Sequence, residues 1–362
     1  MNTFYRIAVG FFGLSSLSFS LAAQMPAKPL LTQPAAASAS TVAPMVLDVV
    51  VADKFGKPVL GLSPQDFTVL DNGQPSKILS FRPPNPPPQP SQVDASTLII
   101  LILDEVNAPY NAVTNAREEV AKFLKQNHGE LTHPVSLGFL NDSGLQLQTQ
   151  PSADGDALAA ALNQQSRSMR IDQKGTGFYG AEDRLKTSMD AMDSFLAQEG
   201  RNQARKMVIW VSPGWPLLSG ARSNLTTDQE QHAFDSVVKL STQLRQAHVT
   251  LYSIDTLGMT GVGQSQSSYY ENFTKPLTDP RHAELGDLGL QVLVTQTGGR
   301  AIFGNEMIQN SINRCTADLD AIYTLAIAPI PADNPNQFHE LTIKLVPPGL
   351  KARTRNGYYA QP

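Results

Sequence analysis

Polar side chains follow two apolar segments of the chain at the point where each segment ends. Asp104, Glu105 and Asn107 come directly after the apolar run at 97–103, and Ser212 closes a second apolar run. Oxygen atoms gathered in this way suit a hard divalent cation. A serine that follows a buried strand suits a nucleophile, and all of these groups can hydrogen-bond a protein partner. The residues are therefore compatible with three functions, namely cation binding, hydrolysis and protein recognition.

Hydrolysis has the weakest support in the residue pattern. Pro213 follows Ser212 and removes a backbone N–H that an oxyanion hole would use. Asp255 and His282 would have to serve as its catalytic partners. The six histidines show no H-x-x-x-H spacing, and the chain has no G-x-S-x-G elbow. We therefore expect no enzyme, and a hydrolase that uses Ser212 is the third interpretation.

The run at 97–103 predicts a strand buried on both faces of a parallel sheet, because its apolar residues do not alternate with polar ones. The next segment, 112–126, has apolar residues at helical spacing. In a doubly wound α/β sheet the loop between such a strand and helix lies at the carboxyl edge, where these folds gather ligand sites. The predicted elements thus place Asp104 and its neighbours at the expected binding edge.

Alternation of strands and helices continues through the middle of the chain. Residues 258–279 have no apolar period and predict a long segment of the kind that forms a lid, a binding loop or disorder. Strands are expected at 134–140, 145–149, 206–212, 249–254 and 300–303, and helices at 153–163, 178–197, 227–247, 283–297 and 306–319.

Both ends of this α/β region show a two-residue apolar period instead. Three short strands at either end make a weak core alone. The economical arrangement is one small β-sandwich formed by the N- and C-terminal segments, with an α/β domain and its mostly parallel central sheet inserted between them. The expected terminal strands are 45–52, 67–70 and 78–81, and then 322–328, 338–346 and 350–359.

Composition and the N-terminus predict an exported protein. The net charge of −4 is spread over interspersed residues, which excludes the basic footprint of a nucleic-acid or anionic-membrane partner. Arg6, the apolar stretch 7–21 and Ala22 or Ala23 predict a secretory signal peptide, with an uncleaved membrane anchor as the alternative. The single cysteine, Cys315, excludes an intrachain disulfide and favours a bacterial envelope. We expect a periplasmic, cell-surface or secreted protein with no membrane role beyond export.

Changes in composition divide the chain into six parts. An Ala-, Pro-, Ser- and Thr-rich stretch lacks the apolar content to fold, and a proline-rich stretch predicts a stiff connector. The expected parts are a signal peptide at 1–23, a flexible tether at 24–43, an N-terminal β segment at 44–82, a linker at 83–95, the α/β domain at 96–319 and a C-terminal β segment at 320–362.

Four landmarks resemble one protein family. They are VVVADKFGKPVLGLSPQDFTVLDNG, LILDEVNAP, ARKMVIWVSPGWP, and the tail HELTIKLVPPGLKARTRNGYYA after TGGRAIF. In these stretches the chain resembles the acidobacterial von Willebrand factor type A-related proteins, and the match covers nearly all of the chain beyond residue 24. The resemblance implies a Rossmann-like sheet of six strands flanked by helices, and a role in protein interaction.

The resemblance also implies a cation site, but this chain lacks several of the ligand residues that the family uses there. The family often holds a divalent cation with a D-x-S-x-S loop, a threonine in a second loop and an aspartate in a third. Asp104 and Thr176 match, but Val106 and Ala108 stand in place of the two hydroxyl residues, and Pro213 follows Ser212 where the aspartate would be. Too few oxygen ligands remain for a convincing magnesium site.

We therefore interpret the chain as an exported protein-interaction protein of the adhesion or scaffold type, with a degenerate ligand edge, no cofactor and an unidentified protein partner. The alternative is a cation-dependent binding module that holds Mg²⁺ or Ca²⁺ at Asp104 and Thr176. Simpler structural roles are a helix cap for Asp104, a turn for Thr176 and a cover of the core for Trp215. The expected partner-binding residues are Asp104, Glu105, Asn107, Thr176, Ser212 and Trp215, in edge loops at 104–110, 175–179, 212–218 and 258–279.

Overall fold

The computed structural model describes residues 43–84, 97–148, 150–166, 177–218, 224–257, 269–304 and 306–361. All of them belong to one compact unit that spans residues 42–362. The predicted signal peptide, nearly all of the tether, most of the proline-rich linker and the candidate Thr176 lie outside the described residues.

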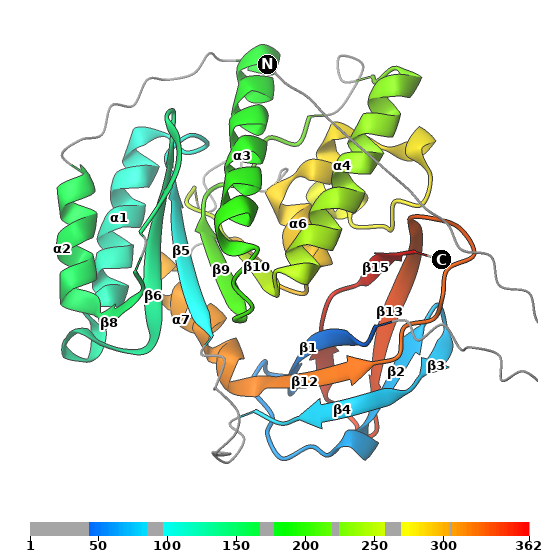
Figure 1. Ribbon diagram of the computed structural model, residues 1–362. Coiled ribbons are helices and arrows are strands. Elements are labelled where there is room, and N and C mark those ends of the chain that lie inside the picture. Colours follow the sequence, from blue (N-terminus) through cyan, green and yellow to red (C-terminus); the bar gives the residue numbers. More distant parts are fainter. Residues whose placement is uncertain are drawn as a thin grey trace, which may run out of the picture. The chain divides into compact units, whose positions relative to one another are not determined.

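A mixed sheet of seven strands forms the centre of the α/β region (Figure 1). The strand order is β11-β10-β9-β5-β6-β7, and β8 pairs with β6. The strands from β11 to β6 are parallel, whereas β7 and β8 run antiparallel to β6. The sheet therefore has one strand more than the six that the resemblance implies. Its members are β5 Leu98–Asp104, β6 Glu130–Asn141, β7 Gly144–Leu147, β8 Ser152–Asp154, β9 Lys206–Val211, β10 Val249–Ile254 and β11 Ala301–Ile302.

The continuous apolar run of β5 is explained by burial on both faces of this sheet. Ile100 and Ile102 belong to one core cluster, whereas Ile99 and Leu101 belong to a second one. Because successive side chains of a strand point to opposite faces, every residue of the run meets a core. The predicted doubly buried strand is confirmed, and it ends at Asp104.

Two groups of helices supply these two cores. Helices α1, α2 and α7 share a cluster with one face of the sheet, and α3, α4 and α6 share a cluster with the other (Figure 1). The helices are α1 Tyr110–Leu124, α2 Gly155–Ser166, α3 Gly177–Glu199, α4 Thr227–Gln246, α6 Leu290–Gln296 and α7 Ile308–Thr316.

The helix expected at 283–297 is wrong in its first half. The chain instead forms a 3₁₀ turn at Leu285–Leu288 and starts α6 after Gly289, whose backbone is extended. A Cβ on Gly286 would come within 2.5 Å of the Phe273 ring, and a Cβ on Gly289 within 2.4 Å of Leu217 Cδ2. Tight packing by residues distant in the sequence thus breaks the predicted helix.

Two four-stranded antiparallel sheets flank the α/β region, in the orders β14-β1-β12-β4 and β15-β13-β2-β3. Met45 in β1 pairs with Ile327 in β12, so the first and last described segments share a sheet. The expected strand at 350–359 is interrupted, because its two halves join different sheets. The strands are β1 Met45–Ala52, β2 Phe67–Asp71, β3 Gln74–Ser76, β4 Ile78–Arg82, β12 Ile322–Ile327, β13 Gln337–Leu345, β14 Lys351–Arg353 and β15 Gly357–Ala360.

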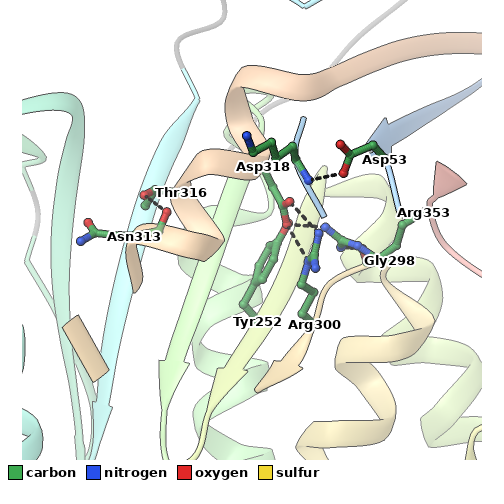
Figure 2. Close-up of polar contacts among 9 residues, drawn as sticks. Asp53, Tyr252, Gly298, Arg300, Asn313, Thr316, Asp318 and Arg353 are labelled. Carbon is green, nitrogen blue, oxygen red and sulfur yellow. Dashed lines mark hydrogen bonds and ion pairs between the residues drawn. The ribbon is translucent and has the colours of Figure 1, made fainter. Parts of the chain in front are cut away.

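A buried carboxylate joins the α/β region to the flanking sheets. Asp318 is 4% exposed and accepts hydrogen bonds from the Tyr252 hydroxyl at 3.0 Å and from Arg300 at 3.0 and 3.2 Å. Arg353 of β14 contacts the same carboxylate and the carbonyl oxygen of Gly298. Figure 2 shows the two guanidinium groups converging on Asp318. Hydrogen bonds and ion pairs to Asp318 therefore connect β14 to the central sheet.

Candidate functional site

Asp104 ends β5 and receives hydrogen bonds on both carboxylate oxygens. Its Oδ1 accepts from the backbone N–H groups of Val106 and Asn107, both at 3.0 Å. Its Oδ2 accepts from Asn107 Nδ2 at 2.8 Å, Trp210 Nε1 at 3.1 Å and Ser212 Oγ at 2.9 Å. With 2% of its surface exposed, the side chain is enclosed by these five donors. We call this arrangement the Asp104 network.

The environment of Asp104 sets two opposing effects on its protonation. Burial raises the pKa of the carboxyl group above its usual value, and the hydrogen bonds from Asn107, Ser212 and Trp210 lower it. Donation by three side chains and two backbone groups is the arrangement that stabilises an ionised, buried carboxylate. The interpretation of Asp104 as a helix cap is wrong, because the N-cap of α1 is Pro109 and the two backbone bonds of Asp104 lie in the loop before that helix.

The surroundings of Asp104 fit hydrogen bonding rather than cation coordination. N–H donors of Asn107 and Trp210 point at the oxygen that a cation would need. Val106 and Ala108 bring no side-chain oxygen. In the part of the chain that the structure describes, no cluster of three or more His, Cys, Asp or Glu residues has a geometry for metal binding.

Glu105, an expected partner-binding residue, is paired with a basic residue inside the protein. Its carboxylate forms a buried ion pair with Arg117 of α1, whose guanidinium also donates to the carbonyl oxygen of Leu162 at 3.0 Å. Burial raises the pKa of Glu105, while the hydrogen bond and charge of Arg117 lower it. The residue thus ties α1 and α2 to the end of β5.

Ser212 holds the turn that follows β9. Its hydroxyl donates to Asp104 and accepts the backbone N–H of Gly214 at 3.1 Å. The side chain is fully buried. A nucleophile must reach its substrate, whereas the Ser212 hydroxyl is fully buried and its oxygen accepts the Gly214 N–H.

Trp215 lies in the core. Its side chain is 2% exposed and packs edge-on against Trp210, with ring centroids 5.3 Å apart. Segment 213–218 folds over the core that α3, α4 and α6 share. Trp215 is therefore buried although the residues around it in the sequence show no apolar period. Its indole nitrogen nevertheless finds no hydrogen-bond partner among the described residues.

A cavity of about 480 Å³ lies beside the Asp104 network, at the carboxyl edge of the sheet. We call it the edge cavity. The loops after β5, β9 and β10 and the helices α3 and α6 form its wall. The residues that line it include Asn107, Arg184, Gly214, Trp215, Leu257 and Gln291.

Gln291 is a site residue that the sequence did not reveal, because it lies in what reads as one continuous amphipathic helix. Its amide rests on Gly214, where a Cβ would come within 1.6 Å of Gln291 Nε2. Gly214 has a φ of +96°, a conformation that favours glycine. The turn formed by Pro213 and Gly214 therefore makes room for an amide.

The remaining edge loops are described in part. Tyr110 and Tyr179 are 62% and 80% exposed at the starts of α1 and α3. The segment at 258–279, expected to form a lid, a binding loop or disorder, contains a 3₁₀ helix at Tyr269–Phe273. Further along, the carbonyl oxygen of Leu277 accepts a hydrogen bond from the Tyr359 hydroxyl at 3.0 Å. This part of the loop is therefore attached to β15.

Comparison with known proteins gives little beyond the geometry. No protein-family model matches the chain, and no curated protein matches it. Among solved structures, similarity is found to an aerotolerance-related membrane protein from Bacteroides fragilis, with 10% identity, a TM-score of 0.35 and coverage of 62% of this chain and 98% of that one.

Two further solved structures are similar at the same level. The pilus adhesin SpaC from Lactobacillus rhamnosus GG has 10% identity, a TM-score of 0.36 and coverage of 82% of this chain and 49% of the adhesin. The TFIIH p34 N-terminal domain has 11% identity, a TM-score of 0.27 and coverage of 61% and 97%. At these TM-scores the likenesses carry no argument about function. Within the described residues, no helix has the length and apolar character to cross a membrane.

Proposed function

We propose that this chain is an exported binding module of the von Willebrand type A kind, of the adhesion or scaffold type, which holds a protein partner at the carboxyl edge of its central sheet without a metal ion. The Asp104 network carries this proposal. In it, five protein donors take up the carboxylate that the resemblance would assign to a cation.

The network supports binding because it connects separate edge elements. Asp104 joins the loop after β5 to the end of β9, through Trp210 and Ser212. Asn107 also donates to Ser188 of α3 at 2.9 Å. A loop edge held in one conformation before binding loses less entropy when a partner arrives. Loops on a rigid sheet are the usual place for such recognition.

The same geometry disfavours an enzyme. The Ser212 hydroxyl is fully buried and its oxygen accepts the Gly214 N–H, and Pro213 supplies no N–H for an oxyanion. The interspersed charge pattern disfavours nucleic acid as the partner. The signal pattern at 1–23 supports a partner outside the cytoplasm.

Site-specific photo-crosslinking tests this function. A photoreactive amino acid replaces Tyr110 or Tyr179 at the edge, and Leu79 of β4, which is 46% exposed, serves as the matched control position. Crosslinking is carried out on cells that express the full chain, with and without a chelator. We expect one discrete protein adduct from the edge positions in both conditions and none from Leu79. Adducts that require added cation, or edge positions that give the same pattern as Leu79, would contradict the proposal.

A further inference from the structure

Arg355, in the loop between β14 and β15, is a buried cation without a partner in the part of the chain that the structure describes. The residue is 9% exposed, and its guanidinium forms no hydrogen bond or ion pair with the described residues. Its nitrogens are not among the unpartnered atoms that the protein encloses completely, so the group keeps contact with solvent. Buried charges in proteins are paired or hydrogen-bonded, because an uncompensated charge is costly. Arg355 therefore requires a partner from outside the described residues.

The backbone around Arg355 is held on both sides. Arg353, two residues earlier, contacts the carbonyl oxygen of Gly298. One residue later, the carbonyl oxygen of Asn356 accepts the N–H of Leu341 at 2.9 Å. A Cβ on Gly298 would come within 2.7 Å of the Arg355 backbone nitrogen, so the loop lies directly against the turn at Gly298. The fold therefore fixes the backbone position of Arg355.

The carboxylate that acts on Arg355 is Asp48, and it already has a partner. In the pairing of β1 with β14, Val50 lies opposite Arg353, and continuing this register by two residues sets Asp48 opposite Arg355. Both oxygens of Asp48 are bonded to Arg205, Oδ2 to Nε at 2.8 Å and Oδ1 to Nη2 at 2.7 Å. Arg355 thus lies beside a carboxylate whose charge is balanced by another arginine.

The C-terminal turn of α4 adds more positive charge. The carbonyl oxygen of Arg245 accepts the N–H of His248 at 3.1 Å, and neither side chain has a hydrogen bond or ion pair with the described residues. Burial and then the charge of Arg245 lower the pKa of Arg355 to about 10, so the two guanidinium groups are close enough to repel each other. Lys206 differs, because its ammonium donates to three backbone carbonyl oxygens and is attracted by Glu199. Two guanidinium groups therefore remain without a counter-charge from the described residues.

We infer that Arg355, Arg245 and His248 bind a tetrahedral oxyanion with two negative charges, of the phosphate class. A dianion balances both guanidinium groups, whereas one carboxylate leaves a cation uncompensated. Guanidinium N–H groups match the oxygens of a phosphate in pairs, and an imidazole N–H adds a further donor. A free phosphate ion and a phosphate monoester share this chemistry. The cluster lies at the starts of β9 and β10, at the opposite edge of the sheet from the Asp104 network, so the inference is independent of the proposed function.

Isothermal titration calorimetry of the full chain with inorganic phosphate tests this inference. The titrations are made at slightly alkaline pH, where phosphate is mostly a dianion, and at an ionic strength held constant with sodium chloride. Sulfate is a second dianion, and acetate is the monoanion control. We expect saturable binding of phosphate and sulfate with a rise in melting temperature, and neither effect from acetate. Methyl phosphate separates the two sources, since it binds as tightly as phosphate if the site accepts an ester and more weakly if the ligand is the free ion.

Matched arginine variants test the role of the cluster. Arg355→Met keeps an unbranched side chain and removes the charge, so it should weaken phosphate binding about tenfold or more, the effect of a lost hydrogen bond to a charged group. Arg245→Met should weaken binding in the same way. In phosphate-free buffer Arg355→Met should melt at or above the wild-type temperature, because it removes an uncompensated buried charge. Arg314→Met is the control, because Arg314 lies on α7 at the other face of the sheet and pairs with Glu306 at 3.0 Å. Its affinity for phosphate should equal that of the wild type.

The absence of saturable heat from both phosphate and sulfate would overturn the inference, and so would equal rises in melting temperature with acetate and phosphate. Wild-type affinity in Arg355→Met, or equal weakening by Arg314→Met, would overturn it as well. A large drop in the melting temperature of Arg355→Met in phosphate-free buffer would show that the guanidinium has a partner within the protein, against the inference. Crosslinking from Tyr110 and Tyr179 does not depend on any of these results, so the proposed function is tested separately.

Discussion

Substitution of Asp104 by asparagine should destabilise the protein strongly whether or not cations are present. Asn has one oxygen and one NH₂ group, and Asp104 has two oxygens that accept five hydrogen bonds. If the NH₂ replaces Oδ2, it faces N–H donors of Asn107 and Trp210. If it replaces Oδ1, it faces the backbone N–H groups of Val106 and Asn107. In either orientation, the NH₂ group of the asparagine faces at least two N–H donors and can accept a hydrogen bond from neither.

The magnitude follows from this count. A hydrogen bond to a charged group contributes about 1.5–3 kcal/mol, so two lost bonds cost about 3–6 kcal/mol. Burial raises the pKa of Asp104, which means that the ionised form carries a desolvation cost that asparagine avoids. Subtracting this cost leaves an expected loss of about 2–5 kcal/mol in the free energy of unfolding.

Urea denaturation of the wild type and Asp104→Asn measures this loss, in chelator and again in excess magnesium. We expect a lower midpoint, an unchanged slope and the same difference in both solutions. Asp255→Asn is the matched control. Asp255 follows β10 at the same edge, but its Oδ1 accepts from the Leu257 N–H, which an asparagine oxygen can replace. A loss below about 1 kcal/mol for Asp104→Asn, or one seen only with magnesium, would refute the reasoning.

Three further outcomes are expected. Burial raises the pKa of Asp287 to about 6 from 3.8, so the native state binds more protons than the unfolded state between these values, and stability falls as pH rises through that window. In the wild type, the free energy of unfolding should therefore fall by about 1–3 kcal/mol between pH 4 and pH 7 because of this group, and Asp287→Asn should remove that fall. Urea denaturation at several pH values measures it, and an unchanged dependence of the unfolding free energy on pH in the variant would contradict the prediction. Arg353→Ala should lower the free energy of unfolding by about 2–4 kcal/mol, because it removes one partner of the buried Asp318 carboxylate. If the difference in unfolding free energy between wild type and variant vanishes in high salt, the ion pair is solvated and the prediction is wrong. Gly214→Ala should cost about 1–3 kcal/mol, because it strains a φ of +96° and collides with Gln291, and a wild-type melting temperature in calorimetry would contradict the described turn.

Local patterns predicted the class of this fold. The uninterrupted apolar run of β5 and the two-residue period at the chain ends reflect how many faces of each strand are buried, and this information is contained in neighbouring residues. The predicted α/β class is confirmed, and the structure has a mixed central sheet with flanking antiparallel sheets. The broken helix before α6 was missed because its cause is packing of Gly286 against Phe273 and of Gly289 against Leu217.

The candidate site was predicted in position but not in detail. Asp104 and Asn107 lie where the strand–loop–helix order places them. The ion pair of Glu105 with Arg117 could not be predicted, because the loop after β5 and the first half of α1 separate the two residues in the chain. The burial of Trp215, for which a cover of the core was one interpretation, depends on helices far along the chain. Gln291 carried no signal at all, since a buried polar residue in a helix becomes visible only once the opposite wall of its cavity is known.

Calorimetric titration of the chelator-treated full chain with magnesium, manganese and calcium tests the central claim most directly, with Asp104→Ala titrated in parallel. A carboxylate already enclosed by five donors predicts no saturable heat from any of the three cations and no rise in melting temperature. Saturable binding in the wild type that Asp104→Ala abolishes would contradict the account and would place a cation at the binding edge.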